Sequence, residues 1–230
     1  MTEPETIRLN KHLALQLGIS RREADELIDR GQVQINDTVA TLGARFNEGD
    51  AITLKGEAVK SGTSFEYLLL HKPVGYVCSR SAQGDSPTVY TLLPEKYHSL
   101  KLVGRLDKNS SGLIMLTNDG DFAYHMTHPK FSKTKIYTVR IDKDLEPLHQ
   151  QMISDHGVTL EDGISKLMLG RLSEKDRKVW QVTMREGRNR QIRRTFESLG
   201  YAVQKLHRTN FGNYALGDIT SGKFEVVDMQ

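Results

Sequence analysis

The chain has 230 residues, of which 37% are hydrophobic and 7% aromatic, with a formal net charge of +3. This composition excludes general disorder, and the length suits one medium domain plus one small domain. No apolar run approaches the roughly 20 residues that span a bilayer, and residues 1–8 lack the features of a signal peptide, so we expect a cytoplasmic protein. The single cysteine, Cys78, lies in an apolar run and is expected to be a buried structural thiol.

The first 60 residues predict two short helices followed by a small sheet. Leucines at every fourth position predict a helix from Arg8 to Leu17, which ends at Gly18. Ser20 and Glu23 have the spacing of a capping box at the start of a second helix, which ends before Gly31. Apolar residues in short strand-like pieces follow, namely Val33, Ile35, Val39, Leu42, Ile52 and Leu54.

A polar segment, Lys60–Ser64, separates this region from a strand-rich one. We therefore expect a domain over residues 1–60, a linker over 61–66 and a second domain over 67–230. The strands expected in the second domain begin with Tyr67–Leu70 and continue with Gly75–Ser79, Lys101–Leu106, Leu113–Thr117, Ile136–Ile141 and Val179–Met184. Helices are expected over Gly120–Met126, Leu145–Ile153 and Arg190–Leu199. This pattern favours an α+β domain built on a mixed or antiparallel sheet.

Charge is distributed unevenly between the two regions. Residues 1–60 hold 8 Lys and Arg against 10 Asp and Glu, whereas residues 61–230 hold 24 against 19. The segment Arg185–Arg208 alone holds seven basic residues and two acidic ones. A basic concentration of this kind fits a polyanionic partner, and a solvated helix face is the alternative that charge alone leaves open.

Two arginines, Arg21 and Arg22, stand at the start of the second helix, where the helix dipole favours acidic residues. With the backbone N–H groups of the helix start they could hold a phosphate, or they could simply point into water. The surrounding sequence resembles the alpha-L RNA-binding domain of ribosomal proteins and RNA modification enzymes, through Arg8–Lys11, Ser20–Ala24, Gly31–Val33 and Gly49-Asp50. The resemblance implies RNA contacts by Arg8, Lys11, Ser20, Arg21 and Arg22.

The stretch Leu102–Gly120 predicts two apolar strands joined by a polar turn, with Asp107 at the end of the first strand. A carboxylate in this position, preceded by Arg105, could be a tuned catalytic group, although aspartate is also common in turns. Four pieces of this stretch resemble the active-site motif of the RsuA family of rRNA pseudouridine synthases: Gly104–Asp107, Ser110, Gly112-Leu113 and Thr117–Gly120. The same resemblance continues in Lys72-Pro73, Pro87–Val89, Lys135–Tyr137, Glu186–Arg194 and Leu206–Arg208.

The resemblance implies a pseudouridine synthase catalytic domain and a role for each matching residue. Asp107 would be the essential carboxylate, Tyr137 would stack on the target base, and Arg193 would pair with Asp107. Arg105 and Leu206 would line the substrate pocket. The cations expected to contact RNA in this domain are Lys72, Arg188, Arg190 and Arg194.

Isomerisation of uridine to pseudouridine involves no redox change and consumes no water, so we expect neither a metal nor an organic cofactor. The carboxylate could attack the ribose or assist the removal of a ribose proton. His125 and His128 have the spacing H-x-x-H but no third ligand nearby in the sequence, so we expect structural or surface histidines.

The segment Gly187–Arg194 resembles the large-subunit members of the RsuA family more than the small-subunit member. We therefore predict 23S rRNA as the substrate, in the form of a folded stem-loop that is either naked or part of a pre-ribosomal particle, and a monomeric enzyme. Two alternatives stay open: a non-catalytic RNA-binding or ribosome-assembly protein with the same fold, and the same chemistry on tRNA.

Overall fold

The computed structural model describes residues 6–59, 62 and 64–228, and the chain divides into two compact units, Met1–Glu66 and Tyr67–Gln230. Positions 61 and 63 of the predicted linker, and Lys60 beside it, lie outside the described residues. No helix in the described part of the chain is long and apolar enough to cross a membrane.

The first unit is the small helix-helix-sheet domain that the sequence predicts. Its helices are α1 (Leu9–Leu17) and α2 (Arg21–Asp29), and Gly18 ends α1 in the left-handed conformation. A four-stranded antiparallel sheet follows in the order β3-β2-β5-β6, formed by Thr38–Val39, Val33–Ile35, Ile52–Leu54 and Glu57–Ala58. A separate pair joins β1 (Ile7–Arg8) to β4 (Arg45–Phe46).

Apolar faces of the two helices and the sheet form the core of this unit. Its buried members are Leu9, Leu13, Ala24, Ile28, Val33, Ala40, Phe46 and Ile52. Leu42, expected in a strand-like piece, lies instead in a turn and is exposed. The turn places Leu42 away from the sheet, so its apolar side chain was a misleading strand signal.

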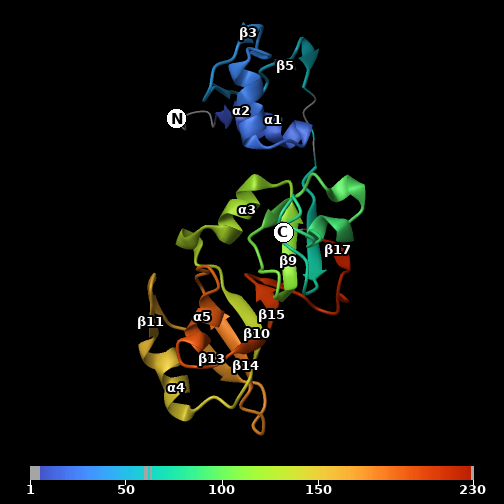
Figure 1. Ribbon diagram of the computed structural model, residues 1–230. Coiled ribbons are helices and arrows are strands. Elements are labelled where there is room, and N and C mark those ends of the chain that lie inside the picture. Colours follow the sequence, from blue (N-terminus) through green and yellow to red (C-terminus); the bar gives the residue numbers. More distant parts are fainter. Residues whose placement is uncertain (1–5, 60–61, 63, 229–230) are drawn as a thin grey trace. The chain divides into compact units, whose positions relative to one another are not determined.

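The second unit is built on a nine-stranded mixed sheet (Figure 1). Seven strands follow one another in the order β13-β14-β10-β15-β9-β7-β17, while β8 pairs with β9 and β16 with β15. Their bounds are Met168–Arg171, Val179–Met184, Lys135–Ile141, Val203–Phe211, Ser111–Thr117, Tyr67–Lys72 and Phe224–Val226, with Lys101–Val103 for β8 and Tyr214–Ala215 for β16. Only β15 and β9 are parallel neighbours among these described pairs, which confirms an α+β fold on a mixed sheet.

Helix α5 (Gln191–Glu197) packs on one half of this sheet. Its Ile192 and Phe196 belong to the same buried cluster as Val139 of β10 and Trp180 of β14. The spacing of four residues between Ile192 and Phe196 puts both on one face of the helix, so the neighbouring arginines are turned off that face. The other half of the sheet is covered by the 3₁₀ turns Val89–Leu92 and Glu95–Tyr97 and by α3 (Gly120–Thr127).

The helix expected over Leu145–Ile153 is shorter and shifted. Helix α4 runs from Pro147 to Gln151 and continues as a π-helical turn, Met152–His156. Proline fits the first helical position and disfavours the helical conformation in the residue before it, so the helix begins at Pro147. A hairpin follows, with strands β11 (Val158–Leu160) and β12 (Gly163–Ser165).

One expected strand is absent, and one long strand was not expected. Gly75–Ser79, expected as a strand, is a turn with a single bridge from Val77 to Thr88, and Gly75 has a positive φ of 96°. Conversely, β15 is a nine-residue strand that local pattern does not predict, because polar residues interrupt its apolar ones. Its position between β9 and β10 joins the two halves of the sheet.

Candidate active site

A cavity of about 470 Å³ lies where the two halves of the large sheet meet. The junction is narrow, because β9 and β15 pair over only two positions, His207 with Ser111 and Arg208 with Gly112. The predicted site residues that line this cavity come from four separate segments of the chain, and they are Arg105, Asp107, Tyr137, Arg188, Arg190 and Leu206. The fold therefore gathers most of the predicted catalytic-domain site at one place.

Tyr137 and Leu206 form an apolar wall of the cavity. They lie on the adjacent strands β10 and β15, and each side chain is 8% exposed. Both belong to the buried cluster beneath α5, which fixes their positions. A ring and a branched aliphatic side chain held in this way offer a stacking surface for a planar base.

Asp107 lies in the turn between β8 and β9, where the backbone N–H of Ser110 donates to its carbonyl oxygen. Its carboxylate is partly exposed, with 36% side-chain accessibility, and Oδ2 lies 3.7 Å from Nη1 of Arg190. A carboxylate at the lip of a cavity, with a cation beside it, is a suitable nucleophile or base.

The cation beside Asp107 differs from the predicted one. The guanidinium of Arg193 donates instead to the carbonyl oxygens of Val203 and Asn109, at 2.8 Å each, and to Oγ of Ser110 at 3.4 Å. Burial lowers the pKa of Arg193, and the charge of Arg190 acts in the same direction. Arg193 therefore supports the turn that carries Asp107, while Arg190, expected to contact RNA, forms the ion pair.

Arg190 reaches the carboxylate because of its backbone. It precedes α5 as the N-cap residue and has a left-handed conformation with φ of 47°. A non-glycine residue in this region costs about 1 kcal/mol or more and persists only where its surroundings hold it. Such strain beside a cavity is typical of functional positions.

Lys72 is also placed differently from the prediction. It was expected to contact RNA, but its side chain is fully buried at the end of β7. Nζ donates to the carbonyl oxygens of Ser110 (2.6 Å), Pro73 (2.9 Å) and Lys108 (3.4 Å). Two of these carbonyls belong to the turn that carries Asp107, so the hydrogen bonds from Lys72 stabilise this turn of the candidate site.

Burial lowers the pKa of Lys72 to about 8. At neutral pH the amine is therefore protonated, and three carbonyl oxygens accept its hydrogen bonds. Electrostatic interactions with Cys78 and, to a smaller extent, with Asp107 act in the opposite direction and raise the pKa of Lys72. The fold keeps a buried charge here because its donors are satisfied.

The buried ammonium predicts a specific pH dependence of stability. The pKa of about 8 in the folded protein lies below the ordinary value of 10.5, so the folded state releases this proton first. Below pH about 8 the buried ammonium lowers the free energy of unfolding by its full amount, and this loss disappears as the pH rises to about 10.5. We expect urea denaturation to show wild type gaining up to about 3 kcal/mol relative to Lys72→Met across this range.

The exposed residue Lys108 provides the control for this experiment. Wild type compared with Lys108→Met should show no such trend over the same pH range. A pH-independent difference between wild type and Lys72→Met would contradict a buried ammonium at this position.

Cys78 supports the same turn from another side. Its Sγ accepts a hydrogen bond from the backbone N–H of Leu106 at 3.4 Å, and burial raises the pKa of the thiol. The side chain packs against the buried clusters of both halves of the domain. The thiol was expected to be structural and buried, and it is partly buried against these clusters.

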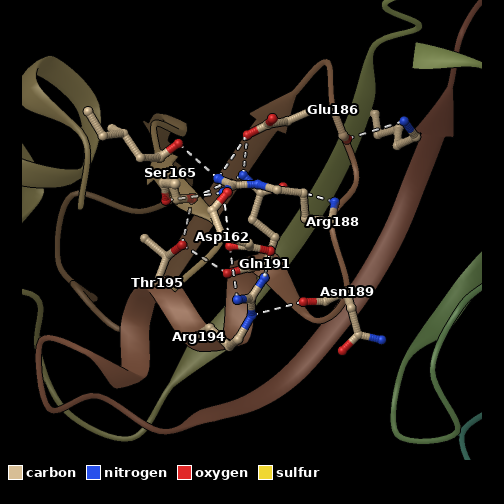
Figure 2. A network of polar contacts seen from close by, with 11 residues as sticks. Asp162, Ser165, Glu186, Arg188, Asn189, Gln191, Arg194 and Thr195 are labelled. Atoms are coloured by element: carbon tan, nitrogen blue, oxygen red, sulfur yellow. Dashed lines mark hydrogen bonds and ion pairs between the residues drawn. The ribbon is translucent and has the colours of Figure 1, made fainter. Parts of the chain in front are cut away.

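Around the start of α5, a network of polar contacts centres on Asp162, in the turn of the β11–β12 hairpin (Figure 2). Its carboxylate accepts two hydrogen bonds from Arg194 (2.7 and 3.0 Å) and one from Arg188 (2.9 Å). These bonds from Arg194 are the main cause of the lowered pKa of Asp162, and the charge of Arg188 adds to it. We call Asp162, Arg188 and Arg194 the arginine clamp.

A second layer of contacts ties the hairpin to α5. Gln191 donates from Nε2 to Oγ of Ser165 and to the carboxylate of Glu186, and Thr195 also donates to Oγ of Ser165 (Figure 2). Ser165, Gln191 and Thr195 are all buried. The hairpin therefore fixes the segment that contains Arg190.

RNA contacts were expected for Arg188 and Arg194, and both arginines belong to the arginine clamp. Both guanidinium groups are paired with carboxylates of the chain, and Arg188 also donates to the carbonyl oxygens of Asp162, Gly163 and Ile164. The sequence shows the arginines but gives no signal for Asp162, because the contact joins residues about 30 positions apart.

Asp162→Ala should lower the rate of a reaction at this site more than it changes substrate affinity. Without the carboxylate, Arg188 and Arg194 repel each other and the segment carrying Arg190 shifts relative to Asp107. Misplacement of a group near a reacting centre costs up to about 10²-fold in rate. Single-turnover kinetics would measure the effect, with Asp176→Ala, which removes the partner of Arg140, as the control.

In the first unit, Ser20 and four cations were expected to contact RNA. Oγ of Ser20 accepts from the N–H of Glu23 at 3.1 Å, and the N–H of Ser20 donates to the Glu23 carboxylate at 2.6 Å, as the predicted capping box requires. Ser20 thus stabilises α2, and it is also exposed. The cations of this unit that were expected to contact RNA are all exposed, namely Arg8, Lys11, Arg21 and Arg22.

Four further cations line the cavity without having been assigned a role from the sequence, namely Lys133, Lys135, Arg185 and Arg208. Burial lowers the pKa of Lys135, and the nearby charge of Arg208 contributes. Arg208 is itself buried and its Nε donates to the carbonyl oxygen of Leu113.

Among the residues that the structure describes, no group of three or more His, Cys, Asp or Glu side chains is arranged to hold a metal.

Comparison with protein families matches both units. A family model described as RNA pseudouridylate synthase matches residues 66–198, which is more than half of the chain, and a model described as S4 domain matches residues 7–52. The cavity, with Asp107 and Tyr137 on its wall, lies largely within the first match.

Several curated proteins are similar along nearly the whole chain. The "Ribosomal large subunit pseudouridine synthase B" of Bacillus subtilis is 34% identical over 94% of this chain and 89% of its own length. The "Ribosomal small subunit pseudouridine synthase A" of Pasteurella multocida is 35% identical over 97% of each chain. The Pseudomonas aeruginosa protein with the large-subunit name is 34% identical, and the chain spans 60% of its length.

A solved structure described as "Crystal structure of pseudouridylate synthase" has the same overall fold. It superposes with a TM-score of 0.68 and 28% sequence identity, over 96% of each chain.

Proposed function

Because the chain belongs to the RNA pseudouridylate synthase family, we propose that it isomerises a uridine of ribosomal RNA to pseudouridine. Its proposed substrate is 23S rRNA, and its proposed subfamily is the RsuA group. The observation that carries the proposal is the carboxylate of Asp107, which lies beside Arg190 and lines the same cavity as Tyr137 and Leu206. Large-subunit names among the similar proteins support 23S rRNA, although one small-subunit name occurs among them.

The proposed reaction breaks the bond between N1 of uracil and C1′ of ribose, rotates the base and joins C5 to C1′. The proton on C5 leaves and N1 gains one, so the atoms balance without redox change or water. Asp107 either attacks the ribose or assists removal of a ribose proton, and both roles require the ionised carboxylate. Nη1 of Arg190 lies 3.7 Å from Oδ2 of Asp107.

The target uridine reaches Asp107 only after leaving its stack, at a cost of a few kcal/mol. Stacking on Tyr137 offsets part of this cost, since base–aromatic stacking contributes about 1–3 kcal/mol. Arg105 is exposed and lines the cavity, and in this proposal it would meet the phosphate of the everted nucleotide.

The remaining parts of the proposal concern the partner. The first unit, with Arg8, Lys11, Arg21 and Arg22 exposed, would bind a folded stem-loop through its phosphates. We propose a monomer that acts in the cytoplasm on naked rRNA or on a pre-ribosomal particle.

In vitro modification tests the substrate assignment. Purified protein would be incubated separately with protein-free 23S rRNA, 16S rRNA and tRNA, and pseudouridines would be mapped in each. We expect new pseudouridine at one or a few positions of 23S rRNA. Modification of 16S rRNA or tRNA alone would overturn the subunit assignment. RNA binding without modification of any of them, or of a pre-ribosomal particle tested in the same way, would favour a non-catalytic RNA-binding protein.

A further inference from the structure

A group of aromatic rings, exposed except for the partly buried Phe131, covers the outer face of α3 and the 3₁₀ turn after it, Pro129–Phe131. The rings belong to Tyr124, His125, His128 and Phe131, and we call them the aromatic platform. Their centroids lie 4.5 Å apart for His125 and Phe131, 4.7 Å for Tyr124 and His128, and 5.7 Å for Tyr124 and Phe131. Tyr124 is 44% exposed, and both histidines are exposed as well.

The platform plays little part in the core. Helix α3 packs inward through Met126, with Phe122 and Ala123 beside it, and these belong to a separate apolar cluster. Large rings gathered on the opposite face lose the stabilisation that burial would give, and an exposed apolar group of this kind marks a binding surface.

The platform is continuous with the candidate active site. His128 belongs to both, because it also lines the cavity, together with its neighbours Met126, Thr127 and Pro129. Lys133, just beyond the platform, lines the cavity too. A chain that enters the cavity therefore passes beside these rings.

The local charge fits a polyanion. Residues 122–135 include three lysines and no acidic residue. Nζ of Lys130 lies over two platform rings, 4.7 Å from the centroid of Phe131 and 5.2 Å from that of Tyr124. Interleaved aromatic rings and cations are the arrangement by which proteins hold single-stranded nucleic acid, with bases on the rings and phosphates on the cations.

We propose that the aromatic platform is a stacking subsite for an unpaired RNA base that neighbours the everted uridine. The inference rests on the proposed function for the identity of the everted nucleotide, and it adds a second base-binding position outside the cavity. An incoming base takes the place of the Lys130 ammonium over the rings, and the ammonium moves to the adjacent phosphate. His128 is the member of the platform that also lines the cavity, so it would separate the two bases.

The test compares two short single-stranded RNAs that contain one central uridine. The first RNA carries ordinary bases on both sides of the uridine, and the second carries abasic sites there with the same phosphates. Affinities of the full chain would be measured by fluorescence anisotropy for wild type, for Tyr124→Leu/Phe131→Leu and for the control Leu148→Ala, which trims an exposed side chain of α4.

We expect wild type and Leu148→Ala to bind the base-bearing RNA more tightly than the abasic one, by about 5- to 100-fold. The double variant should lose most of this preference by weakening only for the base-bearing RNA. Lys130→Gln should weaken binding of both RNAs alike and keep the preference, because it removes a phosphate contact and leaves the rings. Tyr124→Trp should keep the preference, since it keeps an aromatic face.

A double variant with the preference of wild type would overturn the inference, and so would an equal loss of affinity for both RNAs. In the first case the rings would be a surface for another partner, such as a protein. The outcome is separate from that of the proposed function, because the preference is a binding property: a platform can bind bases in a protein that forms no pseudouridine, and a synthase can act without it.

Discussion

Asp107→Asn is expected to abolish pseudouridine formation, lowering the single-turnover rate by at least about 10²-fold, the range in which a positioned acid–base group acts. The amide has the shape of the carboxylate but neither attacks a sugar nor accepts a ribose proton. RNA affinity and melting temperature should stay close to those of wild type, since the side chain is partly exposed and its ion pair with Arg190 is long at 3.7 Å.

Asp144→Asn is the matched control for this prediction. It makes the same change in charge at an exposed position of the same unit that is outside the cavity lining, and it should retain the rate of wild type. A rate for Asp107→Asn within a few-fold of wild type would rule out the carboxylate as the catalytic group.

Gly112→Ala should cause the largest loss of stability among single substitutions in this domain. Gly112 has φ of 108°, and a Cβ there would lie 2.6 Å from the backbone nitrogen of Arg208 and still nearer to its carbonyl oxygen. These backbone atoms cannot move aside, because Gly112 and Arg208 are paired where β9 meets β15. We expect a loss of about 3–5 kcal/mol and a melting temperature lower by about 6–20 °C.

Gly120→Ala provides the comparison in the same domain. Gly120 begins α3, and no atom lies within 4 Å of where its Cβ would be. Because alanine is also the better helix former, we expect a change between zero and about 1 kcal/mol in favour of the variant. Calorimetry of the two variants would measure both effects, and similar melting temperatures for them would contradict the packing described at the β9–β15 junction.

Local sequence pattern predicted the helices well where capping signals are strong. Gly18 and the Ser20–Glu23 pair bound α1 and α2 as expected. Pattern failed for β15, where polar residues alternate irregularly with apolar ones. The strand exists because β9 and β10 flank it on both sides, and this long-range condition is absent from a local window.

The site was predicted in its members but less well in its pairings. Resemblance of motifs brought Asp107, Tyr137 and Leu206 together, and the cavity contains all three. The choice between Arg190 and Arg193 depends on where α5 begins and on one left-handed residue, which the arginine-rich sequence leaves undetermined.

Cations were the hardest residues to assign. A lysine or arginine in a basic segment is expected to meet a phosphate, yet Lys72 holds carbonyl groups of the chain and Arg194 holds Asp162. The carbonyl acceptors and the carboxylate come from segments far away in the sequence. Their roles follow from the tertiary structure alone, and charge counts overestimate the surface available to RNA.

The most direct test of the central claim compares pseudouridine maps of total RNA from cells that lack the gene, after wild type or Asp107→Asn has been restored at equal protein levels. The account predicts that wild type restores pseudouridine at one or a few rRNA positions and that Asp107→Asn restores none of them. Restoration by both proteins, or maps that never change, would contradict a uridine-isomerising role for the carboxylate in this cavity.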